Sequence, residues 1–130
     1  MKKIFGGLIF GLTVSVISVS CYYDKADQVY PTPDCDTTAV SFSTDVQGVF
    51  SQYCNSCHGG TADLGGGIQL NDYTTASGLS LDGLYGGEGT LLSSVLQDGG
   101  ASPMPRGSSK IDDCSINIIR AWKNQGAPNN

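Results

Sequence analysis

The chain has 130 residues, a length that suits a single domain. It carries 12 acidic residues against 7 lysines and arginines, so its net charge is −5. Proteins that bind nucleic acid need a basic face, and we therefore expect no nucleic-acid partner. An acidic surface instead favours protein partners with a basic docking patch, and such an association weakens as salt is added.

The first twenty residues have the layout of a secretory signal peptide. Lys2 and Lys3 precede an uncharged apolar stretch over residues 4–19, and small residues lead up to Cys21. The alternative is a transmembrane anchor, but sixteen residues that include three glycines fall short of the ~20 that a spanning helix needs. We therefore predict that residues 1–20 are removed on export, which changes the net charge from −5 to −7.

The end of this segment, Ile-Ser-Val-Ser-Cys at residues 17–21, resembles a bacterial lipoprotein signal. The resemblance implies that Cys21 is acylated and anchors the protein to a membrane, although Ser18 stands where the family prefers an aliphatic residue. It implies a place in the cell envelope, as a periplasmic or outer-membrane lipoprotein. Tyr22 lacks the aspartate type of inner-membrane retention signal, which favours the outer membrane. Residues 22–40 are polar and contain two prolines, so residues 21–40 are predicted to be a flexible tether and residues 41–130 the folded domain.

The domain is predicted to be helical. Thr44 and Gln47 form a capping box for a helix over residues 44–53, and one apolar stripe follows at Val46, Val49, Phe50 and Tyr53. Residues 59–107 contain thirteen glycines, which leaves room only for short helices over residues 72–77 and 90–97. A last helix begins at Asp112 or Asp113, presents Ile116, Ile119 and Trp122 on one side, and stops at Gly126 and Pro128. No strand pattern is visible, so the predicted fold class is all-α.

One motif carries the chemistry. Cys54-Asn55-Ser56-Cys57-His58 has the spacing of a c-type haem attachment site. Two thiols three residues apart on one turn can add to the two vinyl groups on one edge of the porphyrin. The side chain of His58 then points at the iron, and one short rigid segment fixes all three groups.

Three other interpretations of this motif were weighed. A thioredoxin-like redox pair needs a βαβ setting, which the sequence does not indicate. A zinc site needs four ligands, yet His58 is the only histidine and the remaining cysteines are isolated. A plain disulfide between Cys54 and Cys57 leaves His58 unexplained. Haem attachment accounts for all three residues.

Given a haem, the second ring nitrogen of His58 should donate to a backbone carbonyl, which we expect in the loop 59–67. Met104 is the only methionine left after removal of the signal, and it lies between Pro103 and Pro105. A methionine is more often a core residue, but here its thioether is the best sixth iron ligand. Arg106 is either a partner of a haem propionate or a solvated arginine.

With these residues in view, residues 41–128 resemble the class I cytochrome c family. The resemblance implies N- and C-terminal helices that cross around one covalent haem c, with Gly-rich loops between them. Phe50 and Trp122 match the aromatic residues of those two helices. Val46 replaces the glycine at the family's helix crossing, with Gly48 nearby, which implies a displaced helix contact. More narrowly, CHGG, SPMPRG and the terminal WKNQGAPNN are similar to cytochrome c-like lipoproteins of Bacteroidetes-type bacteria.

The resemblance implies an electron carrier between redox proteins and not an enzyme with a small-molecule substrate, because His58 and Met104 fill both axial positions of the iron. Whether the chain serves as an accessory subunit of an oxidoreductase stays open. Two further classes also stay open. One is a small-ligand sensor or haem-enzyme accessory domain from which Met104 dissociates. The other is a structural lipoprotein that haem merely stabilises.

Two of the five cysteines, Cys35 and Cys114, have no role in anchoring or haem attachment. In an oxidising compartment we expect them to form a disulfide. The family resemblance agrees, because it brings the chain before the first helix close to the C-terminal helix. Two buried free thiols, or an intermolecular bridge through Cys35, are the alternatives.

Overall fold

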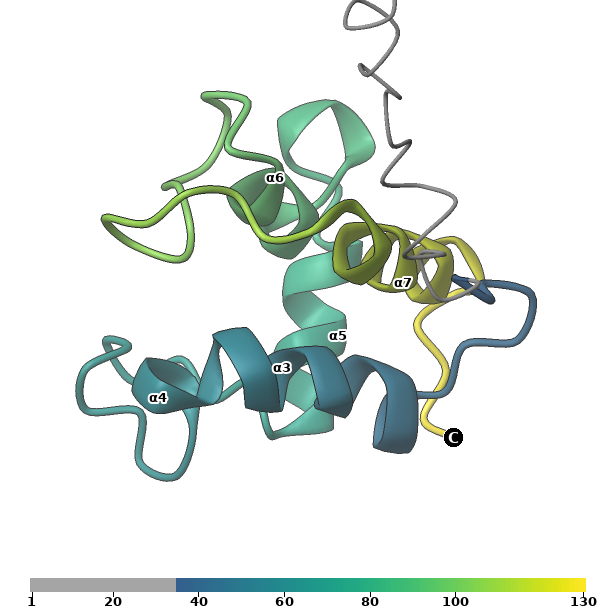
Figure 1. Ribbon diagram of the computed structural model, residues 1–130, viewed down its shortest axis with the longest axis horizontal. Coiled ribbons are helices and arrows are strands. Elements are labelled where there is room, and N and C mark those ends of the chain that lie inside the picture. Colours follow the sequence, from purple (N-terminus) through teal and green to yellow (C-terminus); the bar gives the residue numbers. More distant parts are fainter. Residues whose placement is uncertain (1–34) are drawn as a thin grey trace, which may run out of the picture. The chain divides into compact units, whose positions relative to one another are not determined.

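The computed structural model describes residues 35–130, so the predicted signal peptide and Cys21 lie outside the described residues. Within residues 35–130 every regular element is a helix and no strand occurs, which confirms the all-α prediction (Figure 1). The elements are η2 (Phe42–Val46), α3 (Gln47–Tyr53), α4 (Asn55–His58), α5 (Tyr73–Leu81), η3 (Tyr85–Gly87), α6 (Thr90–Leu96) and α7 (Asp113–Asn124). No helix in this part of the chain has the length and apolar character to cross a bilayer.

The first helix begins earlier than predicted. Ser41 is its N-cap, with its hydroxyl accepting from the Thr44 amide at 3.3 Å, while the Asp45 carboxylate accepts from the Ser41 amide at 2.8 Å. The predicted Thr44–Gln47 capping box is therefore wrong. The first turn, η2, is a wide π-helical turn, which lets the carboxylate of Asp45 reach the backbone amide of Ser41. Gln47 turns away and donates to the Leu70 carbonyl at 3.2 Å.

The two middle helices lie where short helices were predicted, but α5 does not stop at Gly78. Asp72 caps it by accepting from the Thr75 amide at 2.8 Å, and it continues to Leu81 because Ala76 and Ser80 are buried on either side of the glycine. At the start of α6, Gly89 has φ 78°, and a Cβ there would collide with the Ser80 carbonyl. Glycine thus lets α6 start directly against the end of α5.

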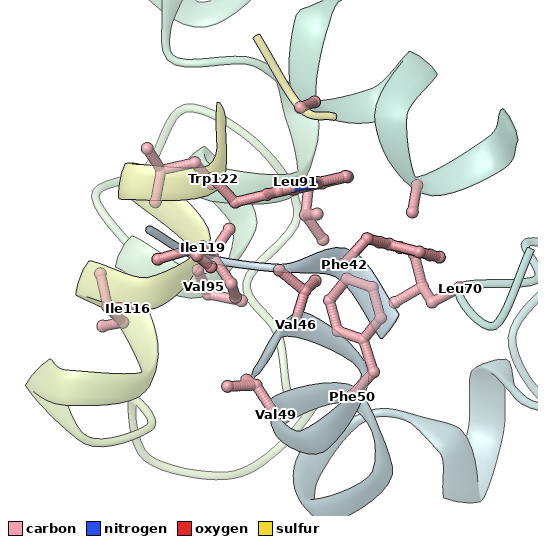
Figure 2. Packing of buried hydrophobic residues seen from close by; sticks show 14 of the residues in the cluster. Phe42, Val46, Val49, Phe50, Leu70, Leu91, Val95, Ile116, Ile119 and Trp122 are labelled. Atoms are coloured by element: carbon pink, nitrogen blue, oxygen red, sulfur yellow. The ribbon is translucent and has the colours of Figure 1, made fainter. Parts of the chain in front are cut away.

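The last helix, α7, closes the core as predicted. Asp112 is its N-cap and accepts from the Ser115 amide at 2.9 Å. Figure 2 shows side chains of α7 facing those of η2 and α3 across the core. The Phe42 ring lies 5.3 Å from the rings of both Trp122 and Tyr73, stacked on the first and edge-on to the second. The core residues facing one another are Val46, Val49, Phe50, Ile116, Ile119 and Trp122.

The contact between the first and last helices is most extensive at η2. Val46, at the position of the family's crossing glycine, has 0% exposure, whereas Gly48 faces open space. A side chain is thus buried at residue 46, and the displacement of the family's helix crossing stays a prediction.

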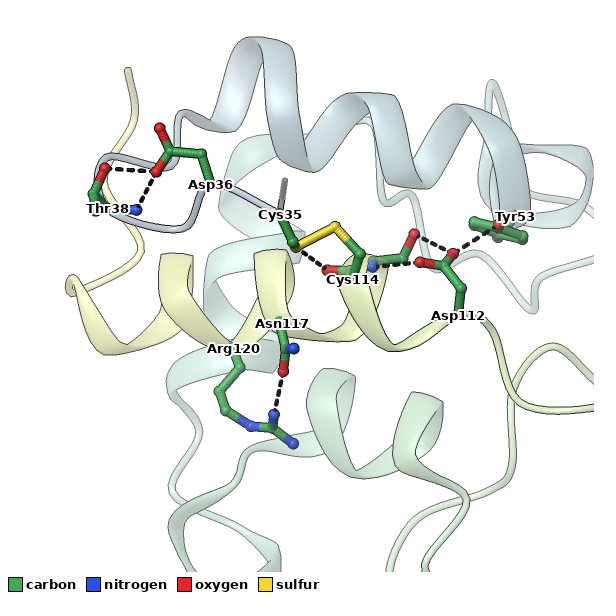
Figure 3. Close-up of a disulfide and its surroundings, with 9 residues drawn as sticks. Cys35, Asp36, Thr38, Tyr53, Asp112, Cys114, Asn117 and Arg120 are labelled. Atoms are coloured by element: carbon green, nitrogen blue, oxygen red, sulfur yellow. Dashed lines mark hydrogen bonds between the residues drawn. A yellow bond between two sulfur atoms is a disulfide. The ribbon is translucent and has the colours of Figure 1, made fainter. Parts of the chain in front are cut away.

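A disulfide joins Cys35 to Cys114 in the first turn of α7, with 5.6 Å between their Cα atoms (Figure 3). Val40 is 2% exposed and belongs to the core, and the Thr37 carbonyl accepts from the Gln125 side chain at 3.2 Å. Residues 35–40, which the sequence predicted to belong to the tether, therefore pack with the folded unit.

Candidate functional site

Cys54, Cys57 and His58 lie together on one helical turn. Cys54 follows α3 directly, and its carbonyl accepts from the amides of Cys57 at 3.0 Å and His58 at 2.9 Å. The short helix α4 therefore fixes both thiols and the imidazole relative to one another. Cys54 is half-buried and Cys57 is exposed, and neither is in a disulfide.

The imidazole of His58 is held in one tautomer. Its Nδ1 lies 3.0 Å from the carbonyl oxygen of Ile68. Because a carbonyl can only accept, Nδ1 must carry the hydrogen, and the neutral ring then presents the lone pair of Nε2. The His58 backbone carbonyl also accepts from the Leu70 amide at 2.9 Å, so two hydrogen bonds tie this residue to the segment 68–70. This is the arrangement of a metal-ligating histidine with an oriented ring.

The carbonyl partner of His58 lies one residue beyond the loop 59–67 where we expected it. That loop contributes in another way. An ideal Cβ on Gly65 would lie 2.5 Å from Nδ1 of His58 and 2.6 Å from the Cys57 carbonyl. Only glycine fits in this space, so the loop backbone lies directly against the imidazole.

Met104 lies on the loop between α6 and α7 and is half-buried. Its amide donates to the Ser94 carbonyl of α6 at 3.0 Å, and its carbonyl accepts from the Gln97 side chain at 3.1 Å. Both backbone groups of Met104 are therefore held by the end of α6. Arg106 is exposed and forms no ion pair within the part of the chain that the structure describes.

An open groove of about 500 Å³ connects the two segments. On one side it is lined by Tyr53 and Ser56, which flank Cys54 and Cys57, and on the other by Pro105, which follows Met104. Its remaining lining residues are Gln52, Ser108, Ser109, Lys110, Ile111 and Asp112. The groove therefore lies between sequence neighbours of the cysteine motif and of Met104, whereas Cys54, Cys57, His58 and Met104 are not among its lining residues.

The residues present fit a flat apolar prosthetic group attached at the cysteines. Leu64 and Ile68, in the loop that contacts His58, remain 81% and 40% exposed. Leu81, Leu84 and Tyr85 are further large apolar side chains that the polypeptide leaves exposed. The two unpaired thiols and the imidazole on one turn are the donor set that haem c requires.

The pKa of the Cys54 thiol is shifted away from that of a nucleophilic cysteine. Burial raises this pKa to about 11, so the thiol stays protonated at neutral pH. A nucleophilic redox cysteine requires the opposite shift. Among residues 35–130, no three His, Cys, Asp or Glu side chains are grouped as they would be around a metal ion.

A polar contact that the sequence did not indicate ties the motif to the last helix. The Tyr53 hydroxyl donates to the Asp112 carboxylate at 2.9 Å (Figure 3), and this hydrogen bond raises the pKa of Tyr53. Tyr53 precedes Cys54, and Asp112 caps α7. The helical periodicity placed Tyr53 in an apolar stripe, and nothing in its spacing pointed to a partner 59 residues away.

Comparisons of the chain with protein-family models, with characterised proteins and with solved structures found no match. The features of this chain that bear on function are therefore the rigid turn over residues 54–58, the oriented imidazole of His58 and the loop that carries Met104.

Proposed function

We propose that this protein is a monohaem c-type cytochrome with a cytochrome c fold, which carries single electrons between redox proteins of the cell envelope. Cys54 and Cys57 would hold the haem covalently, and His58 and Met104 would ligate its iron. The observation that carries the proposal is the 3.0 Å hydrogen bond from Nδ1 of His58 to the Ile68 carbonyl. It leaves Nε2 as a ligand on the same turn as two unpaired thiols.

A bound haem c supplies an iron that cycles between the ferrous and ferric states, one electron at a time. The chain's own residues set the conditions for this cycle. The Ile68 carbonyl orients His58 and would raise its basicity as a ligand, and the thioether of Met104 would favour the reduced iron. The end of α6, which holds the backbone of Met104, would keep its thioether on the iron and so exclude small molecules.

The disulfide between Cys35 and Cys114 supports the proposed export, because such bonds persist in oxidising compartments. Anchoring at Cys21, outside the described residues, completes this proposal. Replacement of Cys21 by alanine should release the protein into the soluble fraction with haem binding intact, as judged by fractionation and absorbance. A variant that stays in the membrane fraction would contradict the lipid anchor without affecting the haem site.

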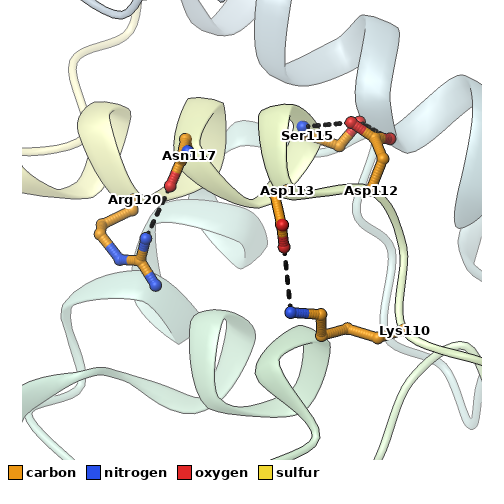
Figure 4. Close-up of polar contacts among 6 residues, drawn as sticks. All are labelled: Lys110, Asp112, Asp113, Ser115, Asn117 and Arg120. Atoms are coloured by element: carbon orange, nitrogen blue, oxygen red, sulfur yellow. Dashed lines mark hydrogen bonds and ion pairs between the residues drawn. The ribbon is translucent and has the colours of Figure 1, made fainter. Parts of the chain in front are cut away.

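The charge distribution supports a partner with a basic docking patch. Lys110 pairs with Asp113 at 3.0 Å, and Arg120 donates to Asn117 at 2.7 Å (Figure 4). The charge of Lys110 is thus paired within its own region of the chain, while acidic residues outnumber basic ones over the whole sequence. Association with the partner is expected to weaken with added salt.

The haem proposal is tested by expression in a strain competent for haem attachment. The wild-type protein should remain red after acid–acetone extraction and give a c-type pyridine haemochrome with one haem per chain. Cys54→Ala/Cys57→Ala should be colourless after the same extraction. Cys35→Ala/Cys114→Ala is the matched control, since it also removes two cysteines but should retain the haem.

Exposure of the reduced protein to CO separates electron transfer from ligand sensing. A carrier with both axial positions filled should cycle reversibly and leave the CO-free spectrum unchanged. A colourless wild-type protein would refute the haem proposal. Stoichiometric CO binding by the wild type would instead favour a sensor with a dissociable methionine.

A further inference from the structure

The residue that ends α6 has an unusual backbone conformation. Gln97 is the C-cap of this helix and lies in the left-handed region, with φ 54° and ψ 36°. Glycine normally occupies such a position because a side chain makes this conformation costly. A side chain in this conformation raises the energy of the backbone, so we expect the side chain of Gln97 to have a specific role.

The side chain of Gln97 holds both ends of the methionine loop. Its Nε2 lies 3.1 Å from the Met104 carbonyl and 3.3 Å from the Ser108 carbonyl. Within the loop, the Ser108 amide donates to the Pro105 carbonyl at 3.2 Å. One carboxamide thus closes the segment 104–108 at both ends.

We propose that Gln97 is the positioning residue that holds Met104 in place as the sixth ligand of the iron. The inference rests on the proposed function, because it concerns the same iron. Gln97 acts through the backbone of Met104 and not on the haem. The left-handed conformation aims the amide at the loop, and the amide in turn keeps the thioether from leaving the iron.

The chemistry of the contact requires an amide of this length. Nε2 has two hydrogens, one for each carbonyl acceptor. A glutamate of the same size has no donor at neutral pH and places a negative charge against two carbonyl oxygens. A glycine relieves the backbone strain but removes the donor.

Imidazole binding to the ferric protein provides the test, because imidazole must displace Met104 to reach the iron. Gln97→Glu and Gln97→Gly should each bind imidazole roughly tenfold more tightly than the wild type, the size expected for the loss of two neutral hydrogen bonds. When the pH is raised, the long-wavelength Met–Fe(III) band should also disappear at a lower pH in both variants than in the wild type. Gln97→Gly is informative because a merely structural role predicts no loss there, since glycine is favoured at a left-handed cap.

Gln125→Glu is the matched control. Its side chain also donates to two backbone carbonyls of a distant segment, those of Thr37 at 3.2 Å and Thr38 at 3.4 Å. This segment is the start of the folded unit and not the methionine loop. The control variant should therefore bind imidazole with the affinity of the wild type.

Hydrogen exchange in the intact protein keeps this inference separate from the haem proposal, because it reports the order of the loop and not ligand binding at the iron. The Met104 and Ser108 amides should exchange faster in Gln97→Glu than in the wild type or in Gln125→Glu. Unchanged exchange, or unchanged imidazole affinity in both Gln97 variants, would overturn the positioning role. A wild-type protein without haem or without the Met–Fe(III) band would overturn the proposed function, and with it the ligand role of the loop.

Discussion

At the scale of single residues, the site requires close packing around His58 as well as the side chains that could bind a cofactor. Gly65 shows this clearly, because its φ lies outside the left-handed region and conformational freedom is not what the position requires. It requires the absence of a Cβ, which would lie 2.5 Å from Nδ1 of His58. The sequence displays three consecutive glycines at residues 65–67, but no pattern in it reveals which one contacts the imidazole.

Gly65→Ala should therefore destabilise the protein by about 1–3 kcal/mol, the usual cost of overpacking a tight contact. Loop displacement should also weaken the hydrogen bond between His58 and Ile68. Denaturant unfolding of the full chain measures the first effect. Gly48→Ala is the control, because Gly48 lies in α3 with open space around it and should gain up to ~1 kcal/mol in helix propensity. Equal effects of the two substitutions would contradict the close packing at His58.

Met104→Ala should leave the haem attached, because attachment depends only on Cys54 and Cys57. The substitution should abolish the Met–Fe(III) band, lower the reduction potential and open the ferrous iron to CO. Absorption spectra and potentiometry measure these changes. An unchanged spectrum would show that another group, such as a lysine, is the sixth ligand.

At the scale of elements, the sequence predicted helices better than their ends. The apolar periodicity placed α7 and the α3 core residues correctly, because each buries one continuous stripe. The cap of the first helix was missed, since Ser41 and Asp45 form the capping pair only when the first turn is wide. The end of α5 was missed because burial of Ala76 and Ser80 outweighs the low helix propensity of Gly78.

The site followed the same division. The local motif at residues 54–58 could be predicted, because all its parts lie on one turn. The contacts that position it could not, because they join residues distant in sequence. The hydrogen bond from Gln97 to the Met104 loop depends on how the chain folds and not on sequence spacing. The same holds for the hydrogen bond from Tyr53 to Asp112.

The cap at Asp112 gives α7 a defined response to acid. Hydrogen bonds from the Ser115 hydroxyl and amide, and from Tyr53, hold the pKa of Asp112 below its usual value. The unfolded chain therefore binds this proton more readily than the folded one. The stabilisation is present above about pH 4, the ordinary carboxyl value, and is lost as the pH falls toward the lowered pKa.

Asp112→Asn should retain the cap, because asparagine is an equally good N-cap residue, but should flatten the loss of stability below pH 4. Asp112→Ala should lose about 0.5–2 kcal/mol at neutral pH as well. Urea unfolding at a series of pH values measures both effects. If Asp112→Asn showed the same acid dependence as the wild type, the carboxylate would not be the group that titrates.

At the scale of the whole molecule, the fold must be held together despite a middle segment rich in glycine. The core closes on protein side chains from η2, α3, α6 and α7, with Phe50 and Trp122 at 0% exposure. The chain termini of the folded unit are tied in as well. The carbonyl of Asn130 accepts from the Ser43 amide at 2.9 Å, and the disulfide fixes Cys35 to α7. The disulfide thus ties the segment before the first helix to the first turn of α7.

The disulfide should therefore contribute a large part of the stability of the folded unit. It spans 79 residues, and its Cα atoms lie 5.6 Å apart, within the range that a disulfide bridges without backbone movement. In the chain-entropy model a loop of this size is worth ~4–5 kcal/mol, as an upper value. Cys35→Ser/Cys114→Ser should lower the unfolding free energy by up to that amount in denaturant titrations, with the haem site retained.

Peptide mapping without reductant should find the two cysteines joined within one chain. Alkylation of both as free thiols in material from the oxidising compartment would show that the bridge is absent, and the wild type would then match the double variant in stability.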